Sequence, residues 1–98
     1  MRIATIIGTV TLVRSHPSMA AARYRLAVPL SLVNLTGESD EMAEELVVYD
    51  DLGAGIGSRI ALSEGGEAAQ PFRPEIKPVD AYTAALLDQI EMAKELLT

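Results

Sequence analysis

The chain has no cysteine and no tryptophan, and aromatic residues make up only 4% of its 98 residues. Without cysteine, a disulfide framework and a thiolate metal site are both excluded. No apolar run reaches the roughly 18 residues that a membrane-spanning helix needs. Residues 1–5 run into an apolar stretch that contains Thr and Gly and has no small-residue cleavage site, so no signal peptide is expected. These absences predict a cytoplasmic protein that does not contact a membrane.

Aliphatic side chains are what the chain has in abundance. Hydrophobic residues make up 49% of it although its formal net charge is −6. Such an apolar content excludes a disordered chain, and the length fits one domain spanning residues 1–98. Since aliphatic residues are many and aromatic ones few, we expect part of the apolar surface to be buried between chains.

The charges fall into blocks along the chain. Residues 1–37 hold four arginines and no acid, whereas residues 38–51 hold seven acids and no base. An acidic run of this kind is typical of a solvated loop. An alternative is that the basic and acidic stretches pair across a subunit boundary. The negative net charge disfavours nucleic-acid binding, because phosphate contacts need a basic stripe.

Four segments have the alternating, β-branched pattern of strands. They cover residues 2–13, 24–33, 45–49 and 58–62. Gly8 in the first predicts a bulge or a close backbone approach, and Pro29 in the second marks an edge or a bulge, because proline cannot donate a ladder hydrogen bond. The acidic stretch 34–46 is expected to be long and exposed, and three prolines keep residues 71–78 irregular.

The C-terminal residues change period. Apolar residues spaced three or four apart predict a helix over about residues 79–98, with Pro78 at its first position. The stripe consists of Val79, Tyr82, Leu86, Ile90, Ala93 and Leu97. Short strands with Gly-marked bends, followed by one helix, predict a mainly β fold: a small OB-like β-barrel with one C-terminal α-helix.

Motifs that carry chemistry are nearly absent. The most conspicuous local pattern is a glycine-rich run, Gly53, Ala54, Gly55, Ile56 and Gly57. It does not fit a dinucleotide fingerprint, because Ser58 stands where the third glycine belongs and a strand follows instead of a helix. A tight turn between strands that uses glycines for positive φ explains the run better.

No set of residues has the pattern of a catalytic or metal site. His16 is the only histidine, and it stands in a loop context. Asp50 and Asp51 are adjacent, so in a strand they point to opposite faces and make a poor acid–base pair. We therefore predict no enzyme activity, no cofactor and no metal.

Three ordered blocks of the sequence resemble the EutN/CcmL family of bacterial microcompartment vertex proteins. Together they span about residues 1–90. The first block is Met1-Arg2-Ile3-Ala4, Ile7-Gly8-Thr9-Val10 and Ser15-His16-Pro17-Ser18; the second is Asp50, the run 53–57, Ile60-Ala61-Leu62 and Gly66-Glu67-Ala68-Ala69; the third is Lys77-Pro78-Val79-Asp80-Ala81 and Leu86-Leu87-Asp88.

The resemblance implies a small OB-like barrel that assembles as a homopentamer. Such pentamers plug the five-fold vertices of a carboxysome-like or metabolosome shell, whose facets are hexameric shell proteins. The implied partners are thus the chain itself and hexameric shell proteins, and the implied location is the microcompartment shell. The glycine run 53–57 is a candidate for close approach to neighbouring copies or to the five-fold axis. Candidate subunit-interface residues are Arg2, Arg23, Asp50, Lys77 and Asp80.

The sequence departs from the family pattern in two places. Gln70, followed by Pro71, replaces an arginine that is common after the Gly-x-Ala-Ala block, and residues 89–97 continue with helical spacing where relatives have a short strand. The alternative function is an OB-type module that binds a small ligand or single-stranded nucleic acid. Its bases would stack on aromatic side chains, for which only Tyr24, Tyr49, Phe72 and Tyr82 are available.

Overall fold

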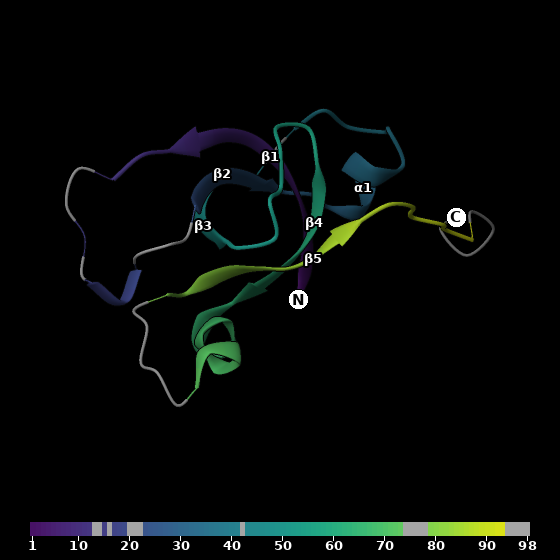
Figure 1. The fold of residues 1–98 in the computed structure, drawn as a ribbon. Coiled ribbons are helices and arrows are strands. Elements are labelled where there is room, and N and C mark those ends of the chain that lie inside the picture. The colour runs from purple at the N-terminus through teal and green to yellow at the C-terminus, as the bar shows by residue number, and fades with distance from the viewer. Residues whose placement is uncertain (13–14, 16, 20–22, 42, 74–78, 94–98) are drawn as a thin grey trace.

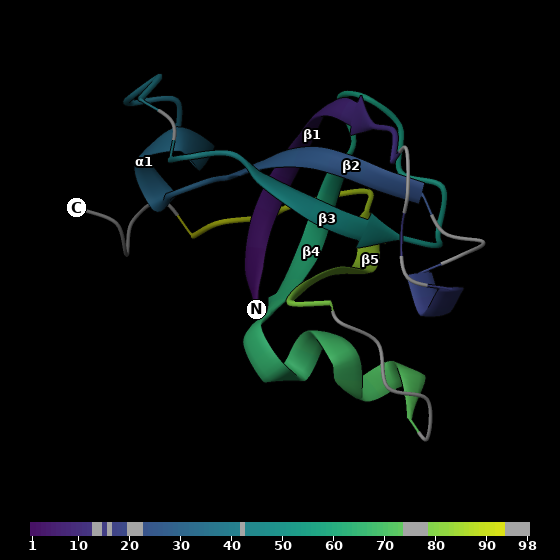
Figure 2. The same ribbon diagram turned by 90° about the vertical axis from the view of Figure 1, so that its left-hand side faces the viewer.

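The computed structural model describes residues 1–12, 15, 17–19, 23–41, 43–73 and 79–93. Within these residues, five strands close into a barrel in the order β1-β2-β3-β5-β4 (Figures 1 and 2). The strands are β1 (Arg2–Val10), β2 (Arg23–Pro29), β3 (Leu46–Asp50), β4 (Arg59–Glu64) and β5 (Ala81–Leu87). The prediction of a mainly β protein with a small barrel is confirmed.

Strand pairing explains how so short a chain closes a barrel. All neighbouring strands pair antiparallel except β3 and β5, which run parallel and meet at Tyr49 and Tyr82. The register of β1 against β2 shifts between Ile6 and Gly8, which confirms the bulge predicted at Gly8. Bulges increase local twist and bend a strand, as barrel closure requires.

In the described part of the chain, three short helices lie outside the barrel: η1 (Pro17–Met19), α1 (Leu32–Leu35) and η2 (Gly65–Phe72). Figure 2 shows η2 below the barrel, directly after β4. The second strand was predicted to reach residue 33, which is wrong, since β2 ends at Pro29. The reason is a capping box, in which Ser31 and Asn34 bond each other's backbone N–H and start α1.

The predicted helix over about residues 79–98 is wrong where the structure describes it. Residues 81–87 form β5, and no helix is assigned to residues 88–93; residues 94–98 lie outside the described part. A spacing of four residues fits one helical turn, but it is also a multiple of the strand period of two. Pairing decided the outcome, because β3 and β4 would otherwise each leave an open edge.

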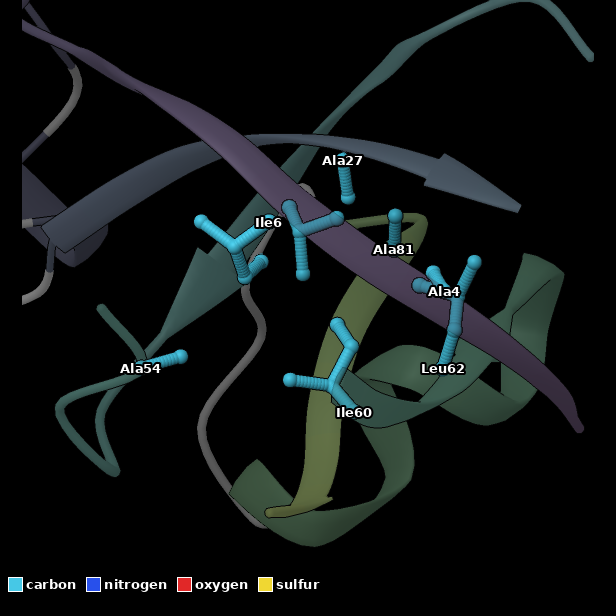
Figure 3. Packing of buried hydrophobic residues seen from close by; sticks show 8 residues of the cluster. Ala4, Ile6, Ala27, Ala54, Ile60, Leu62 and Ala81 are labelled. Atoms are coloured by element: carbon cyan, nitrogen blue, oxygen red, sulfur yellow. The ribbon is translucent and has the colours of Figure 1, made fainter. Parts of the chain in front are cut away.

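The core fills the barrel with small and branched side chains (Figure 3). Its buried members are Ala4, Ile6, Ala27, Val48, Ala54, Ile60, Leu62 and Ala81. Half of these are alanines, which is what the narrow interior of a five-stranded barrel accommodates. The scarcity of aromatic residues follows from this interior. Three tyrosines pack together outside this cluster, and Ala54 enters it from a loop.

Candidate functional site

The connection between β3 and β4, residues 51–58, contains the glycine run and is called the glycine loop below. Gly53 and Gly57 have φ angles of 83° and 90°, in the left-handed region that favours glycine. Ser58 N donates to Gly55 O at 3.0 Å, closing a turn with Gly57 in its third position. The predicted strand-to-strand turn with glycines at positive φ is confirmed.

The far side of the loop is fastened to β1 by backbone hydrogen bonds. Gly57 N donates to Ile6 O at 2.8 Å, and Ile6 N donates to Ser58 O at 2.9 Å. The Ser58 hydroxyl oxygen also accepts from Gly55 N at 3.2 Å. The loop is therefore tied to a core strand more than 50 residues earlier in the sequence.

The near side of the loop is held by a buried carboxylate. Asp50, the last residue of β3, is 1% exposed. Its Oδ2 accepts from Ala54 N at 2.8 Å, and its Oδ1 accepts from Leu52 N at 3.3 Å. Ala54 itself is fully buried, and Figure 3 shows its methyl group pointing from the loop toward the core side chains.

Arg25 on β2 balances the charge of Asp50. Its Nε lies 3.5 Å from Asp50 Oδ2, and its side chain is 11% exposed. Nη1 donates to Thr9 Oγ1 on β1 at 2.9 Å. Nε makes no hydrogen bond to the described residues, so its contact with Asp50 is a charge contact. Arg25 was not among the predicted site residues. The signal in the sequence was a cation two residues before Ala27, hence on the same face of β2, and β2 pairs with β3, which ends in the acid Asp50.

The residues predicted for the subunit interface separate into two groups. Arg23 is exposed and stands opposite Asp50 in the pairing of β2 with β3. These two residues line a hollow with Asp51, Leu52 and Gly53. The structure thus brings Arg23, Asp50 and the glycine loop together, although Asp50 is buried beneath that surface.

Arg2 and Asp80 belong to the other end of β4. Arg2 donates from two guanidinium nitrogens to the Glu64 carboxylate. This contact lowers the pKa of Glu64 and raises that of Arg2. Asp80 is exposed, and its carbonyl accepts from Gly65 N at 2.8 Å. Lys77 lies outside the described residues.

The tyrosines form one packed cluster across β2, β3 and β5. The rings of Tyr24 and Tyr49 meet edge to face at 5.6 Å, and those of Tyr49 and Tyr82 meet at 6.1 Å. Tyr82 also donates to Asp51 Oδ1 at 3.2 Å. Burial raises the pKa of Tyr24 and of Tyr82. Tyr24 and Tyr49 are buried, so their ring faces are not open for bases to stack on, which weighs against the nucleic-acid module.

The described residues lack two features that would point to other functions. They contain no group of three or more His, Cys, Asp or Glu that could hold a metal ion. Among the same residues, no helix has the length and apolar character required to cross a bilayer.

A family model described as "Ethanolamine utilisation protein EutN/carboxysome" matches residues 1–88. The chain belongs to the EutN/CcmL family. The resemblance seen in the sequence is thereby confirmed, and the match ends one residue beyond β5.

Curated and solved relatives agree with this family. The carboxysome shell vertex protein CcmL of Nostoc sp. is 31% identical over 99% of this chain and 92% of its own length. The structure of Gloeobacter violaceus CcmL has a TM-score of 0.78 at 26% identity, covering 94% of this chain and 90% of that one. The GrpN pentameric microcompartment shell protein of Rhodospirillum rubrum has the same fold, with a TM-score of 0.77 at 24% identity, covering 95% and 100%.

Proposed function

We propose that the chain is a structural subunit of a bacterial microcompartment shell and forms homopentamers that cap its five-fold vertices. The observation that carries this proposal is the family match over residues 1–88, together with 31% identity to a carboxysome shell vertex protein over nearly the whole chain. Residues 1–98 would then act as one shell-vertex domain. Its role is architectural and not enzymatic.

Five-fold symmetry explains why such a subunit is needed. A flat sheet of hexamers closes into a polyhedron only where five-fold units introduce curvature. A closed ring repeats one heterologous contact, so each subunit needs two different surfaces that fit each other. Hexameric shell proteins of the facets are the partners that the proposed vertex would border.

Exposed aliphatic side chains supply apolar surface for such contacts. Ile56 at the tip of the glycine loop is 73% exposed, and Leu52 on the same loop and Ile7 beside it are about half exposed. The loop therefore presents apolar side chains to solvent, while hydrogen bonds hold it to the barrel. We expect these side chains to supply part of the apolar surface that the composition predicts to be buried between chains.

The glycine loop is our main candidate for the ring contact. Gly55 is exposed, has no positive φ, and an added Cβ would meet only Ser58 Oγ, at 3.9 Å. A Cβ at this position therefore fits the isolated subunit, and we expect a side chain here to interfere mainly with a neighbour that approaches closely. Arg23 beside the loop, and Arg2, Lys77 and Asp80, are further candidates for the complementary surface.

Shell closure tests the proposed function directly. We would co-express hexameric facet proteins with this chain, with its Gly55→Val variant, or without it, and image the products by electron microscopy. The proposal predicts closed polyhedra with the native chain and open or elongated assemblies without it. Gly55→Val should behave like the omission. Identical closed shells in all three samples would rule out a vertex role.

A further inference from the structure

The buried pair of Arg25 and Asp50 has a cost that the barrel alone does not explain. Asp50 is 1% exposed and the Arg25 side chain 11%, so both charges have lost most of their water. A buried ion pair rarely stabilises a fold more than apolar residues of similar volume do. The pair therefore needs an explanation beyond barrel stability.

The contacts of Asp50 point to the glycine loop. Each carboxylate oxygen accepts one loop amide, from Leu52 and from Ala54. Ala54 is fully buried, and a buried N–H left without an acceptor is costly. The carboxylate thus lets the loop turn inward at Ala54 and outward again at Ile56.

We propose that Asp50 is the positioning residue of the glycine loop and that Arg25 holds its carboxylate in place. Arg25 also donates to Thr9 on β1. Through Asp50, the position of the loop is therefore fixed relative to β1 and β2 as well as to its own strand, β3. Asp50 was expected at the subunit interface, and this assigns it a role beneath that surface. The effect of this positioning on ring assembly rests on the proposed function.

Preorganisation is the physical gain. A loop that is already ordered loses less conformational freedom when a neighbour binds, so more of the contact energy appears as affinity. Gly55 and Ile56 would then be presented in one conformation to the next subunit.

Amide hydrogen exchange by NMR on the full chain tests the positioning role. Asp50→Asn keeps the side-chain shape but removes the charge and one of the two acceptor oxygens. We expect the Ala54 amide to exchange at least about tenfold faster, as the loss of a charge-assisted hydrogen bond gives. Amides in the middle of β4 should lose less protection than the Ala54 amide does. The matched control is Asp51→Asn, which alters the neighbouring carboxylate but leaves the Ala54 acceptor intact.

Arg25→Met tests the second half of the inference. If Arg25 acts through Asp50, this variant should also speed exchange at Ala54, and combining it with Asp50→Asn should add little. Additive effects would show that Arg25 acts independently and would overturn its assigned role. Unchanged exchange in Asp50→Asn, or an equal loss of protection throughout the barrel, would overturn the role of Asp50.

A dissociation control separates this inference from the proposed function. Gly55→Val should weaken the ring without touching Asp50, so its Ala54 amide should stay protected; if protection falls there too, a neighbouring subunit supplied it and the inference fails. Native mass spectrometry of the same samples should show weaker rings for Asp50→Asn than for Asp51→Asn. A native chain that is monomeric would refute the proposed pentamer, while the exchange results would still decide the role of Asp50.

Discussion

The two connections on either side of β3 are built in opposite ways. The acidic connection, residues 30–45, joins β2 to β3, and the glycine loop, residues 51–58, joins β3 to β4. The glycine loop places Ala54 in the core and bonds Ile6 on β1. The acidic connection is held by Asn34, whose amide nitrogen donates to Ser39 O and to Glu41 O.

The difference lies in how far each connection reaches. The bonds of Asn34 join residues at most seven apart, and no residue of α1 is buried. Leu30 N donates to Ile3 O on β1 at 2.8 Å where the connection begins, and the hydrogen bonds of Asn34 beyond it are local. The described part of the acidic connection after Leu30 is therefore a local unit that carries charge on the surface. The glycine loop is part of the barrel, so a change there should affect the whole domain.

The largest expected effect comes from removing the carboxylate under the glycine loop. Asp50→Ala leaves Arg25 buried without its counter-charge and two loop amides without acceptors. We expect a loss of about 3 kcal/mol in the free energy of unfolding, measured by urea denaturation. A loss below about 1 kcal/mol would contradict the difference between the two connections, because the glycine loop would then behave as a local unit too.

A smaller effect is expected at Gly57, whose φ is 90°. Gly57→Ala forces a side chain into the left-handed region and should cost about 1–2 kcal/mol in the same urea assay. Gly55→Ala is the matched control, since Gly55 has no positive φ and its Cβ has room. Equal losses in the two variants would show that backbone strain is not what distinguishes them.

The acidic connection should respond only locally. Asn34→Ala removes the capping box and the bonds that fold residues 38–41 back onto α1. We expect the amides of 32–36 to exchange faster, while the urea midpoint reports a global change below about 0.5 kcal/mol. Faster exchange at Ala54 in this variant would show that the two connections are coupled after all.

The smallest effect is expected at the far end of β4, where Arg2 and Glu64 pair near the surface. Arg2 holds the pKa of Glu64 below its usual value. The pair therefore contributes stability at pH values above the unfolded-state pKa of Glu64, and this contribution disappears as the pH falls through the lower folded-state pKa. Because both side chains are partly exposed, we expect only about a few tenths of a kcal/mol.

Urea unfolding of the native chain and of Glu64→Gln, at pH values from neutral to acid, measures the contribution of this pair to the free energy of unfolding. The two curves should differ at neutral pH and converge in acid. A difference that grows as the pH falls would contradict the sign of the shift.

Local patterns in the sequence predicted most of the barrel but not its closing strand. Alternating residues and Gly8 were enough for β1, and Gly53 and Gly57 were enough for the turn. β5 was predicted as a helix because its apolar spacing fits both periods, and only its pairing with β4 and β3 decides between them. That information is not local.

The candidate site was only partly predicted, because part of it also depends on contacts between strands that are distant in the sequence. The glycine run is visible in the sequence, and Asp50 was selected, but as an interface residue. Its burial depends on which way the end of β3 faces, and the role of Arg25 depends on the pairing of β2 with β3. Both are properties of the assembled barrel.

The central claim, that the chain assembles as a ring of five, is tested most directly by the mass of the native assembly. Native mass spectrometry of the purified chain should give a ring of five, near five times 10.5 kDa. Gly55→Val, measured at the same micromolar concentration, should shift this population toward smaller species. A native chain that remains a clean monomer under these conditions would contradict the account.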